Sequence, residues 1–175
     1  MVKHTLFLKW WLYFAVTCAG AYIAYQFDVF NEIYDKDVSK LSFVIMFGFV
    51  FMSLWCGVKT FIVSQALNAM KPLNTQAGIT RRVETAMKQE EHGWFACSKF
   101  EQIGYVGTLI GFIIMLAGFA NIDPSQLKSL QSLIVSLGAG MATALYTTLV
   151  GLVCSHLLSY QYHNLGQAIR ELKDE

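Results

Sequence analysis

Charged residues are scarce in this sequence, and their scarcity indicates the class of protein. Asp, Glu, Lys and Arg make up only 14% of the 175 residues, whereas 55% are hydrophobic and the mean hydropathy is +0.44. Soluble domains usually carry about 25% charged residues, so the composition predicts a membrane protein. The net charge of +1 offers no concentrated basic surface, which argues against nucleic acid as the partner.

Cysteine and histidine are also few, and their spacing predicts neither a disulfide framework nor a metal site. Cys18, Cys56 and Cys154 fall in apolar runs, and Cys97 lies in a polar stretch. We interpret all four as buried thiols that act as small apolar groups. The four histidines are scattered, and no nucleophile, base or phosphate loop stands out. We therefore expect neither an enzyme nor a bound cofactor.

Long apolar runs dominate the rest of the chain. Each run is long enough to cross the hydrocarbon core as a helix, which needs about 20 residues; the runs cover approximately residues 8–27, 41–64, 103–120 and 133–158. The first is too long and too aromatic for a secretory signal peptide, so we interpret it as a retained span. The sequence thus predicts an all-α integral membrane protein with four transmembrane helices.

Lysine and arginine are unequally distributed between the two sides of these spans. With the N-terminus inside, ten basic residues lie on the cytoplasmic side and three on the outer side, so the positive-inside rule predicts that both termini are cytoplasmic. The predicted units are an outer transmembrane hairpin (1–66), a short cytoplasmic helical loop (67–102), an inner transmembrane hairpin (103–160) and a cytoplasmic C-terminal tail (161–175).

The two predicted hairpins differ in side-chain size. The first two spans are rich in large aromatic residues, which suit contact with lipid and its interfaces. The third and fourth are rich in small residues, which allow helix backbones to approach closely. We expect the second pair to face protein and to pack through these positions: Gly104, Gly107, Gly111, Gly140, Ala144 and Gly151.

Threonines stand on these small-residue faces. Thr108 and Thr148 are expected at comparable depth in the cytoplasmic half of the membrane, and Thr147 is adjacent to Thr148. A threonine in a membrane helix commonly bonds only to its own i−4 carbonyl, but matched hydroxyls can also coordinate a small cation or a water chain. No Asp, Glu, Lys or Arg lies in the predicted hydrocarbon zone. If the chain moves ions, a second protein must supply the carboxylate.

Two stretches carry a resemblance to a known family. GYVGTLIGFIIMLAG (104–118) followed by GAGMATALYTTLVGL (138–152) resembles the paired signature of the MotA/TolQ/ExbB family, ion-channel subunits of bacterial membrane rotary machines. The matching positions are Gly107 and Thr108 in the first motif, and Ala144, Leu145, Thr148, Gly151 and Leu152 in the second. Four spans with both termini inside look more like the flagellar stator branch than the three-span TolQ and ExbB branch.

The resemblance implies both an assembly and a mechanism. It implies a pentameric ring, lined by the third and fourth spans, around two single-span partner helices of the MotB/TolR/ExbD type in the bacterial inner membrane. An aspartate of the partner would carry the ion, and Thr108, Thr148 and the neighbouring Thr147 would line its path. The transported ion would be a proton, the family default, or a sodium ion, which the adjacent threonines would suit. Ion-motive force would then drive mechanical work.

The region before the first motif departs from the family pattern. Glu101 stands where relatives usually have a proline, and the loop of residues 67–102 is short where flagellar stators carry a large cytoplasmic domain. We expect helical structure to be interrupted at Lys71 and Pro72 and a new helix to begin at about Ile79. The charges near the two ends of this helix oppose its dipole. They are therefore candidates for cytoplasmic coupling to a partner, the alternative being a simple amphipathic connector: Arg81, Arg82, Glu90, Glu91 and Glu101.

A function of another class also fits part of the sequence. A tetraspan scaffold or a holin-like pore without ion coupling would account for the small size and the glycine-rich spans. It would not account for matched threonines on the two inner helices. The two hypotheses differ in the neighbouring reading frame, which should encode a single-span protein with an early Asp only if the chain belongs to a motor.

Overall fold

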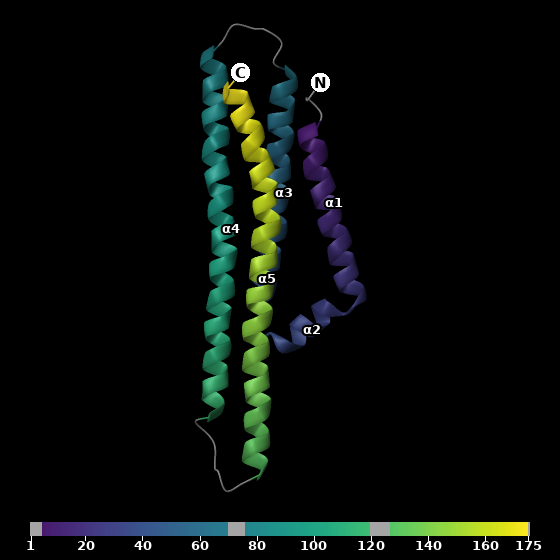
Figure 1. Cartoon of the computed structure of the whole chain (residues 1–175), viewed down its shortest axis with the longest axis vertical. Coiled ribbons are helices and arrows are strands. Elements are labelled where there is room, and N and C mark those ends of the chain that lie inside the picture. The colour runs from purple at the N-terminus through teal and green to yellow at the C-terminus, as the bar shows by residue number, and fades with distance from the viewer. Residues whose placement is uncertain (1–4, 70–75, 120–126, 175) are drawn as a thin grey trace.

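Five helices make up the described residues of the computed structural model of this chain. The backbone is described for residues 5–69, 76–119 and 127–174, and the side chains of these ranges are described except at 5–6, 63, 65–69, 76–90, 127–129, 168 and 171–174. The helices are α1 (Thr5–Gln26), α2 (Val29–Lys36), α3 (Leu41–Ala69), α4 (Gln76–Phe119) and α5 (Leu127–Asp174). Four long helices lie side by side, and the short α2 runs sideways from the lower end of α1 toward α5 (Figure 1).

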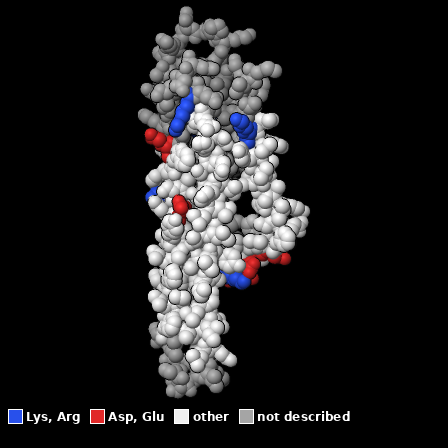
Figure 2. All heavy atoms as spheres, in the orientation of Figure 1, with Lys and Arg blue, Asp and Glu red and all other residues white. Residues whose placement is uncertain are grey.

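The four long helices contain segments that are long and apolar enough to cross a membrane. These are Phe7–Gln26, Leu41–Ile62, Glu91–Phe119 and Leu130–Gln167. The predicted all-α fold class with four such helices is confirmed. In Figure 2 the lower half of the molecule, formed by α4 and α5, is almost without charge among its described atoms, and the charged side chains lie in the upper half and on α2.

Helices α4 and α5 are longer than the sequence predicts. The predicted cytoplasmic helix begins at Gln76 rather than near Ile79 and continues through residue 102 to Phe119 without interruption. The C-terminal tail likewise continues α5 as far as Asp174. The predicted boundaries followed a change in polarity, which does not by itself end a helix, and no proline occurs in either segment. The expected break at Lys71 and Pro72 lies outside the described residues.

The core lies where α3 packs against α4 and α5. Its buried residues come from α3 (Ile45, Cys56), α4 (Cys97, Phe100) and α5 (Cys154, Leu158, Tyr162, Leu165, Ile169). Within it, the Ser53 hydroxyl of α3 donates a hydrogen bond of 2.9 Å to Oε1 of Gln161 on α5. Three of the cysteines are buried here as expected, whereas Cys18 on α1 is exposed because α1 packs too loosely to cover it.

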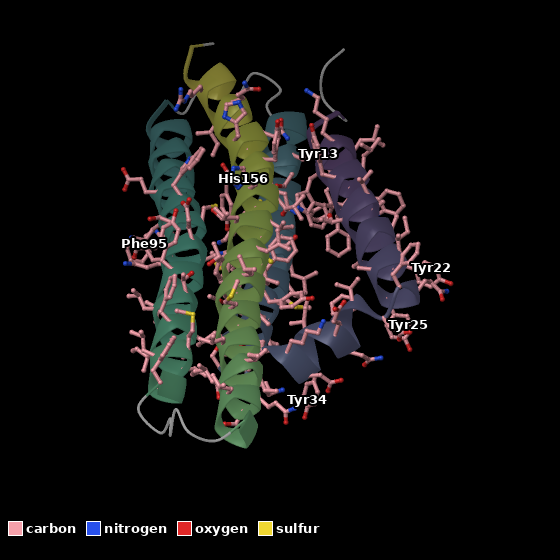
Figure 3. The ribbon with its side chains drawn as sticks, turned by 60° about the horizontal axis from the view of Figure 1, so that its bottom comes forward. Tyr13, Tyr22, Tyr25, Tyr34, Phe95 and His156 are labelled. Atoms are coloured by element: carbon pink, nitrogen blue, oxygen red, sulfur yellow. The ribbon has the colours of Figure 1, made fainter. Side chains whose placement is uncertain are left out.

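Helix α1 is the most peripheral of the long helices. None of its described side chains is buried. It contacts the bundle through Trp10, whose ring lies directly on Gly57 of α3, and through Tyr13, whose ring centroid is 6.2 Å from that of Tyr160 on α5. Tyr22 and Tyr25 project away from the other long helices (Figure 3), which is the arrangement expected of an outer layer that faces lipid.

The loop between α1 and α3 folds into a capped corner. Its eight-residue helix α2 was not predicted, because it is much too short to cross a membrane and lies in a polar stretch. Asp37, which is fully buried, follows α2, and its carboxylate accepts hydrogen bonds from the amides of Ser39 (3.0 Å), Lys40 (3.1 Å) and Ser42 (3.0 Å). It thereby satisfies the Ser42 amide in the first turn of α3, which has no partner within the helix, and the amides of the two residues in the turn before α3.

Candidate functional site

Glycines bring α4 and α5 into backbone contact. A Cβ atom added at Gly111 would lie 2.5 Å from the carbonyl oxygen of Gly140, and one added at Gly140 would lie 2.6 Å from the carbonyl oxygen of Gly111. The other small residues selected from the sequence lie along the same contact: Gly104, Gly107, Ala144 and Gly151. No side chain larger than hydrogen fits at Gly111 or Gly140 without separating the helices, so these positions fix the distance between α4 and α5.

The structure brings Thr108 and Thr148 together across this contact. Their hydroxyl oxygens are hydrogen-bonded to one another, although the residues are 40 positions apart. The Thr148 hydroxyl also lies 3.0 Å from its own i−4 carbonyl, that of Ala144, and both hydroxyls lie within 3.4 Å of the carbonyl oxygen of Gly104. We call Thr108 and Thr148 the threonine pair. Both are half-buried, so the pair lies at one edge of the contact rather than inside it.

Thr147 is placed differently from its neighbour. Its side chain is fully buried and fills the space opposite Gly107. Its hydroxyl lies 2.8 Å from the carbonyl oxygen of Thr143 and 3.2 Å from that of Ala144, both on its own helix. Within one subunit, therefore, Thr147 packs in the interior of the α4–α5 contact, while only the threonine pair reaches its edge.

Thr143, which was not among the predicted site residues, connects α5 to the corner between α2 and α3. Its hydroxyl donates to the carbonyl oxygen of Lys36 (3.1 Å) and accepts from the amide of Val38 (3.2 Å). Its position four residues before Thr147, on a helix rich in small residues, was the available signal. Because Thr148 follows Thr143 by five residues, the threonine pair lies about 7 Å along α5 from this corner. The pair is therefore closer along the bundle to the α2 end of α3 than to its C-terminal end, and its expected depth in the cytoplasmic half of the membrane stays a prediction.

The residues selected for cytoplasmic coupling do not form a cluster with the threonine pair. The side chains of Arg81, Arg82 and Glu90 lie outside the described residues, and Glu91 is exposed. Glu101 is half-buried on α4, and its Oε1 accepts a hydrogen bond of 3.2 Å from the Tyr105 hydroxyl.

The chemistry available at the threonine pair is that of hydroxyl groups. A hydroxyl donates one hydrogen bond and accepts two, but it does not hold a proton as a titrating group at physiological pH. Among the residues described with their side chains, no group of three His, Cys, Asp or Glu is placed to hold a metal ion. The pair can therefore orient a water, a small cation or a carboxylate, and it needs a titratable group from elsewhere to carry a proton.

Comparison with known proteins identifies the family. No curated protein and no solved structure matches the chain. The family model of the MotA/TolQ/ExbB proton channel family matches residues 57–175, which include α4, α5, the small-residue contact and the threonine pair. With four apolar helices, and with more than half of its length matched by this model, the chain is a multi-pass membrane protein that belongs to the MotA/TolQ/ExbB proton channel family.

Proposed function

We propose that this chain is the ion-conducting subunit of a motor complex in the bacterial inner membrane, driven by ion-motive force. The observation that carries the proposal is the threonine pair. Two segments distant in sequence place their hydroxyls in mutual contact at the edge of a helix contact that is rich in glycine and alanine. Such a pair can exchange its mutual hydrogen bond for bonds to a passing ion, to water or to a carboxylate.

The proposed assembly is a pentameric ring around two single-span partner helices of the MotB/TolR/ExbD type. The α4–α5 hairpin extends past α2 (Figure 1), and its apolar side chains are uncovered within one subunit. Among them Leu109 is 62% exposed, Ile113 65%, Ile134 67% and Val135 71%. Neighbouring copies and partner helices would cover part of this surface, and lipid would cover the rest.

The partner would supply the titratable group that the threonine pair lacks. An aspartate on the partner helix, brought to the edge of the α4–α5 contact, would accept hydrogen bonds from the hydroxyls of Thr108 and Thr148 while ionised. It would release those bonds as it takes up a proton or a sodium ion. Stepwise loading of partner carboxylates around the ring would convert ion flow into rotation. Both termini of this subunit would be cytoplasmic.

The assembly is tested by co-expressing the chain with its neighbouring reading frames. Native mass spectrometry of the detergent-solubilised complex should give five copies of this chain and two of a single-span protein. A lone subunit, or a ring without a partner, would favour the scaffold or holin-like pore instead, because neither would contain a carboxylate to carry the ion.

Ion conduction is tested by flux into vesicles that contain the purified complex. We expect Thr108→Ala and Thr148→Ala each to abolish flux while leaving the assembly intact. Thr17→Ala is the matched control, because Thr17 also lies in an apolar helix but bonds only to carbonyls of its own α1. Parallel measurements with proton-sensitive and sodium-sensitive dyes identify the ion. Unchanged flux in both pair variants would disprove this role of the threonine pair.

A further inference from the structure

Glu101 lies deeper in the molecule than its sequence context suggests. The sequence predicts that Glu101 belongs to a cytoplasmic loop. In the structure, Glu101 lies inside the apolar segment Glu91–Phe119 of the continuous helix α4. The preceding residue, Phe100, rests on Gly48 of α3, where an added Cβ would be 2.9 Å from Cε1 of Phe100. Gly48 is seven residues, about 10 Å, inside the start of the apolar segment Leu41–Ile62. Glu101 is therefore level with the apolar interior of α3.

Glu101 also lies on the side of α4 that carries the threonine pair. Glu101, Gly104 and Thr108 follow one another at spacings of three and four residues, which place them on one face of a helix. Glu101 is about 10 Å from Thr108 along the axis, toward the N-terminal end of α4. On α5, Gly151 packs against the carbonyl oxygen of Phe100, so Glu101 borders the same contact between the two helices.

The groups around Glu101 do not neutralise its charge. Tyr105 donates to it at 3.2 Å. Lys99 points from another side of α4, where its Nζ donates to Gln102 at 2.8 Å and lies 4.8 Å from the ring centroid of Phe95. On α5, His156 is exposed, and its Nδ1 lies 2.8 Å from the Leu152 carbonyl oxygen of its own helix. Among the residues described with their side chains, one ion pair has its charged atoms within 4.0 Å, and it joins Lys36 to Glu32 within α2.

A carboxyl group at membrane depth without a cationic partner is costly, and such residues usually mark ion or proton pathways. We infer that Glu101 is an ion-binding carboxylate that this chain itself contributes to the ion path, on the cytoplasmic side of the threonine pair. The inference rests on the proposed function and extends it. The partner aspartate would exchange its ion with Glu101, and each subunit of the ring would provide one such relay position between the threonine pair and the cytoplasm.

The position of Glu101 in the apolar part of the membrane can be tested without a partner. Dicyclohexylcarbodiimide is an apolar reagent that adds to protonated carboxyl groups. With the full chain in lipid vesicles, mass spectrometry of proteolytic fragments should locate the adduct on Glu101, with none at this position in Glu101→Gln and none on Glu32, which lies outside the apolar segments. If sodium chloride protects Glu101 from labelling and potassium chloride does not, the ion that Glu101 binds is sodium. Equal labelling in both salts would identify the proton as the bound ion. Absence of the adduct from Glu101 would overturn the inference.

Flux through the complex separates this inference from the proposed function. We expect Glu101→Gln, which is nearly isosteric, to lower flux by about a hundredfold, the scale of a lost proton-transfer group, while Glu101→Asp retains most of it. Lys99→Gln removes a charge at similar depth and should conduct like the unaltered complex. If Thr148→Ala abolishes flux and Glu101→Gln does not lower it, the relay role of Glu101 is wrong and the proposed function stands. If the unaltered complex conducts no ions, both are wrong.

Discussion

Adding one methyl group between α4 and α5 provides the sharpest test of the small-residue contact. In Gly140→Ala the new Cβ would lie 2.6 Å from the carbonyl oxygen of Gly111 and 2.7 Å from the backbone nitrogen of Met115. Neither backbone atom can rotate away as a side chain could. Restoring an ordinary contact of 3.4 Å therefore requires the two helices to separate by about 0.8 Å, because steric repulsion rises steeply at shorter distances.

Two opposing effects determine the size of the change. Alanine favours the helix over glycine by about 1 kcal/mol, whereas overpacking a close contact costs about 1–3 kcal/mol. A cost near the upper end is expected here, because the two atoms nearest the new methyl group are backbone atoms of α4, which cannot move without the helix. The net expectation is a loss of about 1–2 kcal/mol, or about 2–8 °C in unfolding temperature for a chain of this size.

The assay is thermal unfolding of the purified chain in one detergent, with Gly138→Ala as the matched control. Gly138 lies two residues away on the same helix, and nothing lies within 4 Å of a Cβ added there. The control should unfold at the same temperature as the original chain or slightly higher. Equal unfolding temperatures for Gly140→Ala and Gly138→Ala would refute the reasoning, because the backbone contact would then not limit the helix distance.

Three further substitutions test other parts of the structure. Ser53→Ala leaves the buried Oε1 of Gln161 without its hydrogen bond and should lower the free energy of unfolding by about 1–3 kcal/mol in chemical denaturation, whereas Ser98→Ala, at an exposed position, should have little effect. Thr143→Val removes the partner of the Lys36 carbonyl and the Val38 amide, so hydrogen exchange at Val38 should accelerate; an unchanged rate would contradict the proposed link between α5 and the corner. The hydrogen bond from Lys36 holds the pKa of Glu32 below its ordinary value of 4.5, so this contact stabilises the fold above that value and is lost as the pH falls through the lowered pKa. Carboxyl NMR should show Lys36→Met returning the titration of Glu32 toward 4.5.

The sequence predicted the long elements better than their ends. Hydropathy locates the membrane segments because amino-acid composition determines whether a segment is apolar enough to lie in lipid. The first two predicted spans differ from the apolar segments of the structure by at most a few residues. It cannot locate the ends of α4 and α5, because a helix continues through a change of polarity wherever neighbours pack against it. Gly93 illustrates this: the ring of Tyr162 on α5 lies directly against it, so the helices pack together beyond the predicted inner hairpin.

The candidate site was predictable to the extent that it depends on helical spacing. The positions of Gly104, Gly107 and Gly111 in the contact follow from their periodicity and small size. The sequence could not separate Thr147 from Thr148, because adjacent residues differ by 100° around a helix and only the packed structure shows which one faces the interior. Nor could it find the role of Thr143, because its partners are backbone groups more than 100 residues away.

The continuity of α4 has a mechanical consequence. A helix of 44 residues spans about 66 Å, roughly twice the hydrocarbon thickness of a membrane. From Thr108 to its first residue, Gln76, α4 extends about 48 Å. An inclination of only about 5° at the threonine pair would therefore carry the far end through about 4 Å, a distance comparable to the pitch of one helical turn. A change of bonding partner at a single hydroxyl would thus become a displacement of several ångströms at the N-terminal end of α4, without a hinge along the helix.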